Sequence, residues 1–214
     1  MVGMNTCEYC MTEIPVHTGK GRRRRYCSPR CKMRAHRLEE ARPPQDMLMQ
    51  TRWVNWKPVR RGDTVTKMPV QPDGTPASST DPYTWTDYET AEQLHAGVGM
   101  GFVLGGGFAC LDLDHCYDSR NHLADWAKKL IMLAGDTFIE ISPSGDGLHI
   151  WGLCEPRKGI KLRDGMNIEA YSQGRYITVT GKPYKTSKRK LADLTVLMNL
   201  AEHDAFGRLF NDDK

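Results

Sequence analysis

Apolar and polar residues alternate along several short segments in the middle of the chain, which is the pattern of half-buried β-strands. Phe102–Leu104 is followed by three consecutive glycines, which give the freedom of a tight turn, and the chain returns as Phe108–Asp114. Successive side chains of a strand point to opposite faces, so Asp112 and Asp114 share one face and the adjacent leucines take the other. The pattern therefore predicts two neighbouring carboxylates on one strand.

The same alternation predicts further strands on both sides of this one. They are Arg52–Val59, Thr137–Ser142, Leu148–Leu153, Asn167–Tyr171 and Arg175–Thr180. Residues 143–147, which are rich in turn formers, separate the second and third of these strands. The third strand places His149 and Trp151 on one face, where the tryptophan serves either core packing or base stacking. Apolar residues at helical spacing predict helices over 88–95, 122–134 and 191–210.

The acidic residues on these strands indicate a bound cation. Asp112 and Asp114 repel each other on one strand face, which costs stability unless a cation lies between them. Mg²⁺ is commonly held by one or two carboxylates together with substrate phosphates. Glu169 lies in mid-strand between two apolar residues, where an acid is costly without a compensating metal or cation. The alternative for the Asp-x-Asp pair is a solvated strand face.

Ser144 and Gly145 lie in the turn before His149 and are candidate phosphate contacts. Exposed backbone N–H groups in a Gly/Ser turn suit the close approach of a phosphate, although such a turn is also common as a plain hairpin. Three strand-borne acids, a strand-borne histidine and this turn together predict a site for metal-assisted phosphoryl transfer.

This order of motifs resembles the archaeo-eukaryotic primase superfamily, and within it the primase-polymerase (prim-pol) domains of phages and plasmids. The segments that carry the resemblance are Asp112–His115, Ser142–His149 and Ile168–Tyr171. Three upstream segments also have sequences similar to the family: Arg52–Trp56, Lys67–Pro69 and Ser78–Trp85. The chain departs from the family's motifs at Gly147, where members often have serine, and at Glu169, where many have aspartate.

The resemblance implies an α+β fold with an RRM-like catalytic core of mixed β-sheet and helices. It implies template-directed nucleotidyl transfer by a DNA primase and DNA polymerase, which makes primers on single-stranded DNA from nucleoside triphosphates. In the two-metal scheme of this family, Asp112, Asp114 and Glu169 hold two Mg²⁺ or Mn²⁺ ions. The residues implied at the incoming nucleotide are His149, Ser144 and Gly145. Arg175 is a further candidate, placed to reach either the triphosphate or the template; its alternative is a surface arginine at a hairpin turn. A separate replicative helicase is an expected partner.

Four of the seven cysteines form two close pairs near the N-terminus, with the spacing of metal ligands. They are Cys7, Cys10, Cys27 and Cys31. Four thiolates complete a structural tetrahedral Zn²⁺ site. A segment this short cannot form a stable hydrophobic core without a bound metal or a similar cross-link. The alternatives are two disulfides, or a histidine ligand (His17 or His36) in place of a cysteine. The sequence around Cys27 and Cys31 is similar to that of small zinc-ribbon and treble-clef-like fingers.

The positive charge of the chain lies in the same N-terminal segment. Residues 1–42 hold ten Lys/Arg and four Asp/Glu, a net charge of +6; the other residues hold twenty and twenty-two, a net charge of −2. A basic run is normally a solvated face, but beside a zinc site it indicates a salt-sensitive contact with phosphate backbone. The predicted nucleic-acid-binding residues are Arg22, Arg23, Arg24, Arg25, Arg30, Lys32 and Arg34.

A length of 214 residues with 39% hydrophobic residues allows one sizeable domain and a small appendage. The predicted divisions are a four-cysteine zinc finger over 1–42, a semi-rigid linker over 43–48, a catalytic domain over 49–187 and a C-terminal helix over 188–214. Without a membrane-length apolar run or a signal-peptide core, we expect a cytoplasmic protein, in the bacterial host if phage-encoded. Two other classes stay open: a metal-dependent nuclease, and a non-catalytic zinc-finger protein that binds DNA in replication.

Overall fold

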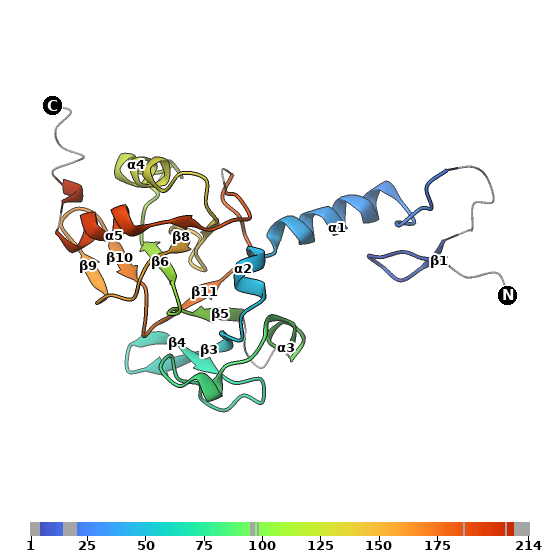
Figure 1. The fold of residues 1–214 in the computed structure, drawn as a ribbon, viewed down its shortest axis with the longest axis horizontal. Helices are drawn as coiled ribbons and strands as arrows, with labels where there is room; N and C mark the ends of the chain where they lie inside the picture. Colours follow the sequence, from blue (N-terminus) through green and yellow to red (C-terminus); the bar gives the residue numbers. More distant parts are fainter. Residues whose placement is uncertain are drawn as a thin grey trace. The chain divides into compact units, whose positions relative to one another are not determined.

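The computed structural model describes residues 5–14, 21–94, 97, 99–185, 187–203 and 205–207. The chain forms two compact units, Met1–Arg42 and Pro43–Lys214 (Figure 1). The first unit is small, and the second holds both of the larger sheets.

The first unit combines a two-stranded sheet with one helix. Strands β1 (Asn5–Thr6) and β2 (Glu13–Ile14) pair antiparallel. Helix α1 (Pro29–Ala41) begins after Ser28, whose hydroxyl accepts a hydrogen bond from the Cys31 backbone N–H at 3.2 Å. Proline is well suited to the first helical position, where its missing N–H has no helical partner to lose. None of the thirteen residues of α1 is buried, so the helix adds almost nothing to an apolar core.

The segment expected to be a linker belongs to the second unit. Residues 45–48 form helix α2 (Gln45–Leu48), and Met47 within it is fully buried. The carbonyl of Met47 accepts a hydrogen bond from the Trp53 indole at 3.1 Å. The prediction of a linker over 43–48 is therefore wrong, because this segment packs into the core.

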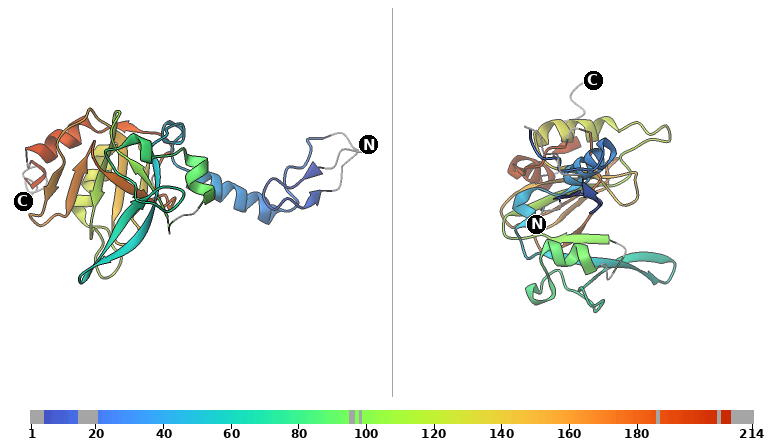
Figure 2. Two further views of the ribbon diagram at one scale, coloured as in Figure 1. Left: turned by 90° about the horizontal axis from the view of Figure 1, so that it is seen from below. Right: turned by 90° about the vertical axis from the view of Figure 1, so that its right-hand side faces the viewer.

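The second unit contains a four-stranded antiparallel sheet in the order β11-β5-β3-β4. Its strands are β3 (Trp53–Arg61), β4 (Thr64–Val70), β5 (Gly99–Val103) and β11 (Tyr176–Val179). The tip of the β3–β4 hairpin projects from the rest of the unit (Figure 2).

A six-stranded sheet has the order β12-β8-β6-β10-β9, with β7 also paired to β8. Its strands are β6 (Phe108–Leu113), β7 (Ile139–Ile141), β8 (Leu148–Leu153), β9 (Ile160–Leu162), β10 (Ile168–Tyr171) and β12 (Ala192–Asp193). Strand β12 runs parallel to β8, and the other pairs are antiparallel. The expected hairpin of β7 and β8 is present.

The three-glycine turn joins the two sheets and does not close a hairpin. Strand β5 ends in the four-stranded sheet, and β6 begins in the six-stranded one. Gly105, Gly106 and Gly107 all have positive φ (125°, 64° and 93°), a conformation that other residues rarely adopt. The turn was predicted correctly, but the return of the chain alongside the same strand was not.

The helices of the second unit are α3 (Tyr88–Leu94), α4 (Asp125–Ala134) and α5 (Thr195–Glu202), with a 3₁₀ turn at Pro82–Thr84. Helix α4 starts three residues later than predicted, because the Asp118 carboxylate accepts from the N–H groups of Arg120 and His122 and holds a turn there. Helix α5 follows β12 and is shorter than the predicted C-terminal helix; residues 204 and 208–214 of that prediction lie outside the described residues. In the described part of the chain no helix combines the length and apolar character of a membrane span.

Apolar side chains cover both faces of the six-stranded sheet. On one face Leu111 and Leu148 pack with residues of α4 and α5. On the other face Trp151 packs with Trp53 and Phe102 of the four-stranded sheet. Both tryptophans are buried, so of the two interpretations of Trp151 core packing is correct and base stacking is wrong. The chain is thus a mixed α/β protein, and the RRM-like arrangement stays a prediction.

Candidate active site

Five polar residues form one row across five neighbouring strands of the six-stranded sheet. Asp112 on β6 lies directly opposite His149 on β8 and Glu169 on β10. Beyond them, His149 lies opposite Glu140 on β7, and Glu169 lies opposite Lys161 on β9. Directly opposite residues of antiparallel strands have Cβ atoms about 4.5–5.5 Å apart. The register of the sheet therefore brings together residues that are far apart in the sequence.

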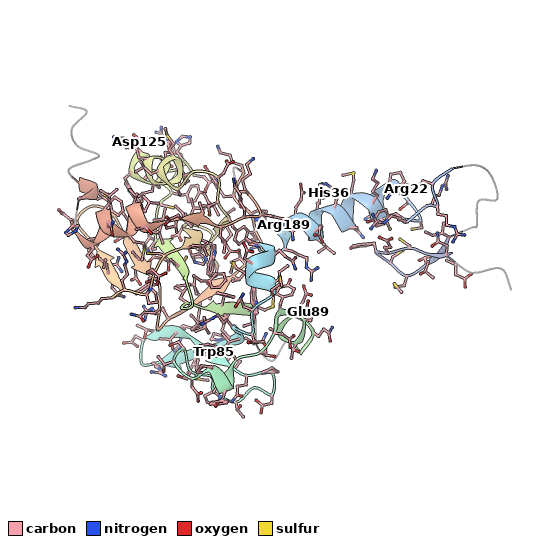
Figure 3. All side chains as sticks on the ribbon, in the orientation of Figure 1. Arg22, His36, Trp85, Glu89, Asp125 and Arg189 are labelled. Atoms are coloured by element: carbon pink, nitrogen blue, oxygen red, sulfur yellow. The ribbon has the colours of Figure 1, made fainter. Side chains whose placement is uncertain are left out.

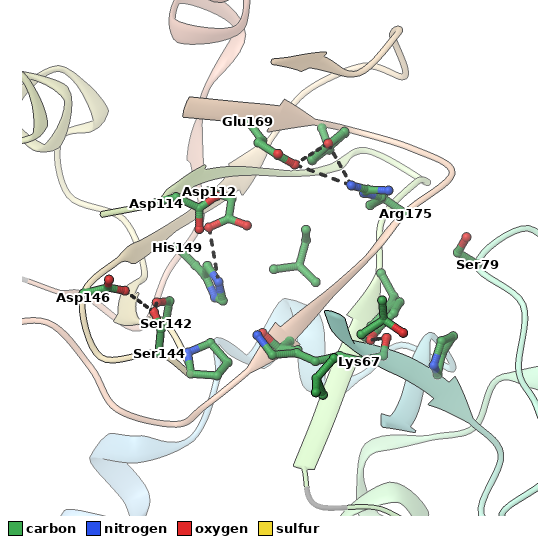
Figure 4. Close-up of a pocket in the computed structure, with 18 of the residues that line it drawn as sticks. Lys67, Ser79, Asp112, Asp114, Ser142, Ser144, Asp146, His149, Glu169 and Arg175 are labelled. Carbon is green, nitrogen blue, oxygen red and sulfur yellow. Dashed lines mark hydrogen bonds and ion pairs between the residues drawn. The ribbon is translucent and has the colours of Figure 1, made fainter. Parts of the chain in front are cut away.

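The three central residues of this row line a cavity of about 720 Å³, which is enclosed by both sheets and the loops around them (Figure 4). The predicted site residues that line it are Asp112, Asp114, Ser144, His149, Glu169 and Arg175. Lys67 and Ser79 reach the same cavity from β4 and from the loop that follows it. Figure 4 shows Asp112 and Asp114 close together, with His149 on one side and Glu169 and Arg175 on the other.

Asp112 carries a carboxylate that is poorly compensated. Its Oδ1 atom is buried and has no hydrogen-bond partner among the described residues. The basic group near that oxygen is His149, whose Nε2 lies 3.6 Å away. Burial raises the pKa of Asp112, and the charges of Asp114 and Glu169 raise it further against the opposing effect of His149. A buried, unpartnered carboxylate oxygen beside a second carboxylate fits a divalent cation.

Glu169 is compensated by cations of the protein. Its carboxylate accepts hydrogen bonds from Lys161 at 2.9 Å, from Arg163 and from the Tyr171 hydroxyl. Burial opposes ionisation, but these hydrogen bonds outweigh it and lower the pKa of Glu169 to about 2. Arg175 lies 3.5 Å from the same carboxylate and stacks on the Tyr171 ring.

The three acids therefore share one cavity without forming a closed ligand cluster. Among the described residues, the four N-terminal cysteines are the group whose potential ligand atoms all lie within 4.8 Å of one another. Glu169 is drawn toward Lys161 and Arg163, on the side away from His149. A metal role for Glu169 requires its carboxylate to exchange these cations for the metal, and it stays a prediction.

His149 forms the buried floor of the cavity, with an exposed fraction of 2%. Its Nδ1 lies 3.1 Å from Oε1 of Glu140, and its Nε2 faces Asp112. Burial lowers the pKa of His149, but the hydrogen bond to Glu140 and the charge of Asp112 outweigh this, so the pKa is raised. The imidazole is thus held between two acids.

The turn before His149 is organised by its own side chains. The hydroxyls of Ser142 and Ser144 lie 2.9 Å apart, and Ser144 donates to Asp146. The Gly145 N–H donates to the Ser142 carbonyl at 3.0 Å, and Gly145 does not line the cavity. The expected exposed N–H of Gly145 is therefore engaged within the turn, while Ser144 faces the cavity as expected.

Two groups of the site escaped the sequence analysis. Glu140 alternates with two isoleucines on β7, which is the same buried-acid signal that singled out Glu169. His115 also lines the cavity; its Nδ1 lies 2.6 Å from the Asp146 carboxylate, and its φ is +50°. The sequence around Asp146 predicts only a turn, because its partner His115 lies 31 residues away in the chain.

Gly147 has a steric reason for departing from the serine common in the resembling family. A Cβ atom at this position would lie 2.6 Å from the Leu113 carbonyl oxygen and 2.8 Å from the Ser142 hydroxyl. We expect Gly147→Ala to displace the turn and destabilise the protein by about 1–3 kcal/mol, which thermal unfolding measures. Gly207→Ala is the comparison for steric crowding, because a Cβ there meets nothing within 4 Å and its φ is not positive. Equal losses for both variants would contradict the steric explanation.

The four cysteines of the first unit form a candidate metal centre. The Sγ atom of Cys27 lies 3.6 Å from that of Cys10 and 3.4 Å from that of Cys31, and Cys10 and Cys31 are 3.8 Å apart. A tetrahedron with Zn–S bonds of about 2.3 Å has S–S edges of about 3.8 Å. All four are free thiols in the structure, so the donor set fits a metal such as zinc and not two disulfides.

Of the two histidines considered as alternative ligands, the structure describes one, His36. His36 on α1 (labelled in Figure 3) is exposed and pairs with Glu40 at 3.2 Å. His36 is not part of the cysteine cluster. His17 lies outside the described residues.

Five of the seven predicted basic residues line a second cavity, of about 620 Å³, in the first unit. It is lined by Arg22, Arg23, Arg24, Arg25, Tyr26 and Lys32, among others. Arg25 is partly neutralised by an ion pair with Glu8. Arg30 and Arg34 do not line this cavity, and Arg34 lies over the Tyr9 ring.

No family model matches the chain. A protein of Nitratiruptor phage NrS-1 named DNA primase-polymerase is 38% identical over 163 residues, which cover 71% of this chain and 22% of that protein. The chain thus spans about a fifth of the length of the relative that it matches. This similarity, over most of the chain, supports a relation to a phage primase-polymerase.

Proposed function

We propose that the chain is a template-directed nucleotidyltransferase, a DNA primase and polymerase that makes primers on single-stranded DNA. The observation that carries the proposal is the row of Asp112, His149 and Glu169 beside a 720 Å³ cavity. In this row a buried Asp112 oxygen has no hydrogen-bond partner in the part of the chain that the structure describes. The similarity to a phage DNA primase-polymerase supports the same function. Nucleotidyl transfer depends mainly on positioning and charge neutralisation, which such a site supplies.

Asp112 and Asp114 are the proposed ligands of two Mg²⁺ or Mn²⁺ ions, and Glu169 completes the set once it leaves Lys161 and Arg163. The ions neutralise the charge that develops on the attacking and leaving oxygens. Asp112 lies on β6 and Asp114 directly follows the end of that strand, and both residues line the cavity.

The triphosphate of the incoming nucleotide is proposed to lie between His149, Ser144 and Arg175. These donors come from three different segments around the cavity, and Arg175 is half exposed. Lys67 is a further cation on the opposite wall. A bound triphosphate would therefore contact basic side chains and a hydroxyl donor on several sides of the cavity.

The first unit is proposed to be a zinc finger that holds the template strand. Four thiolates would hold Zn²⁺ as a structural ion, and Arg22–Arg25 with Lys32 offer a cationic surface. We further propose that a replicative helicase acts as a partner.

Primer extension tests this function directly. The purified chain is incubated with single-stranded DNA, labelled nucleotides and Mg²⁺ or Mn²⁺, and products are resolved by length. Template-dependent products that require the divalent ion support the proposal. Shortened DNA without extension would indicate a nuclease, and neither product would indicate a non-catalytic DNA-binding protein.

The basic surface yields a prediction for template binding. We expect Arg23→Ala combined with Arg24→Ala to weaken binding to single-stranded DNA and to reduce the slope of log K against log salt by about 0.7 per lost phosphate contact. Fluorescence anisotropy at several salt concentrations measures both. Lys128→Ala, which removes a cation paired with Asp125 on α4, should leave the slope unchanged. An unchanged slope in the double variant would contradict the assignment.

A further inference from the structure

Glu140 is a carboxylate with no exposed surface at the end of the polar row. A buried charge is costly unless it is paired and fully hydrogen-bonded. Its two neighbours on β7, Ile139 and Ile141, are apolar. An acid in such a place requires a set of partners that compensates for the loss of water.

The partners of Glu140 divide between its two oxygens. Oε1 lies 3.1 Å from Nδ1 of His149 and accepts from the Trp151 indole at 3.2 Å. Oε2 accepts from the backbone N–H groups of Thr180 and Gly181 at 2.9 and 3.0 Å, and from the Thr180 hydroxyl at 3.1 Å. One oxygen thus faces β8 in the six-stranded sheet, and the other faces the segment that leaves β11.

These contacts join two walls of the candidate active site. His149 forms the floor of the cavity, and residues 175–178, which lead to Thr180, form part of its other side. Oε1 of Glu140 accepts from the Trp151 indole and acts as an acceptor toward Nδ1 of His149 as well, so Glu140 directs Nδ1 to itself and turns Nε2 toward Asp112. Trp151 donates to the same oxygen but does not line the cavity.

We propose that Glu140 is a positioning residue of the nucleotide site: one carboxylate oxygen fixes the orientation of His149, and the other fixes the end of β11 against it. This inference rests on the proposed function, because it assumes that His149 contacts the nucleotide. Glu140 itself contacts no reacting atom and acts through His149 and the β11 wall.

Glu140→Gln is the central test, because it keeps the shape of the side chain but replaces one acceptor oxygen with an NH₂ group. We expect the KM for the incoming nucleotide to rise about 10–100-fold, by analogy with the loss of affinity or activity when the partner of a metal-bound histidine is replaced. The ¹⁵N resonances of the His149 ring should shift in the protein without nucleotide. Trp151→Phe is the matched control, since it removes the other donor to the same oxygen; it should lower stability but leave the KM within about twofold.

His149→Gln separates positioning from general stability. The carbonyl oxygen of glutamine can still accept from Thr180 and Gly181, so Glu140→Gln removes mainly the contact with His149 and should add little to the KM in the His149→Gln background. A full additional loss there, or a wild-type KM and unshifted His149 resonances in Glu140→Gln, would overturn the proposal. If Glu140→Gln does not fold, Glu140→Asp replaces it, because aspartate keeps the carboxylate but is one methylene shorter. A wild-type KM and unshifted His149 resonances in that variant would also refute the proposal. A chain that extends no primer at all would refute the proposed function, whereas the ring resonances would still report on the contact with Glu140.

Discussion

Asp112→Asn is expected to abolish nucleotide incorporation and, at the same time, to stabilise the protein in the absence of metal. A metal ligand contributes several kcal/mol to stabilising the transition state. Since each 1.4 kcal/mol corresponds to a factor of ten in rate, the loss should be about three orders of magnitude or more. Primer extension measures the first effect, and thermal unfolding in a chelator measures the second.

The stabilisation follows from the burial of an uncompensated charge. The pKa of Asp112 is raised in the folded state, chiefly by burial, so folding favours the protonated form. The contribution of this group to stability is therefore greatest at low pH and is lost as the pH rises through the folded pKa. At neutral pH the carboxylate costs stability, and asparagine removes that cost. A gain of about 1–2 kcal/mol corresponds to about 2–8 °C for a domain of this size.

Two comparisons make this prediction sharp. Mg²⁺ or Mn²⁺ should raise the unfolding temperature of the wild-type protein and have little effect on Asp112→Asn. Asp136→Asn changes an exposed acid that pairs with Lys190 at 3.4 Å, and it should alter stability by less than about 0.5 kcal/mol and retain activity. Retained activity in Asp112→Asn, or a lower unfolding temperature without metal, would contradict the assignment of Asp112.

The faces of the site strands could be predicted because they follow from a period of two. Asp112, His149 and Glu169 each alternate with apolar residues, and each lies on the predicted face. Which strands pair, and in which register, could not be read from the sequence. Asp112 meets His149 and Glu169 only through long-range pairing of β6 with β8 and β10. The motifs of the resembling family supplied this association, not the local pattern.

The parts that were missed have partners that are distant in the sequence. Glu140 shows an Ile-Glu-Ile pattern, but its compensation comes from Thr180 and Gly181 after β11. Met47 follows two prolines typical of a linker, yet it is buried because the Trp53 indole and its neighbours cover it. In both cases local composition predicted the chemistry of the segment, and tertiary packing decided its role.

The largest structural effect is expected from breaking the cysteine cluster. Among the described residues of the first unit, Cys7 and Ile14 are the buried apolar side chains, and α1 buries none. So small an apolar core cannot stabilise the unit, whereas structural zinc in finger peptides contributes about 10–16 kcal/mol of binding free energy. We therefore expect chelation, or Cys10→Ser, to unfold this unit.

The second unit has its own two cores and should keep its unfolding transition when the first unit loses its metal. Calorimetry and metal analysis of the full chain measure these effects, and anisotropy should show at least a tenfold loss of affinity for single-stranded DNA. His36→Ala is the matched control, because His36 is exposed on α1 and pairs with Glu40 outside the cysteine cluster. It should retain one zinc ion and full template affinity. Cys7 and Ile14 are too small a core to hold this unit without metal. A zinc-free Cys10→Ser variant that still folds and binds DNA would therefore contradict the assignment of the cysteines as a structural metal site.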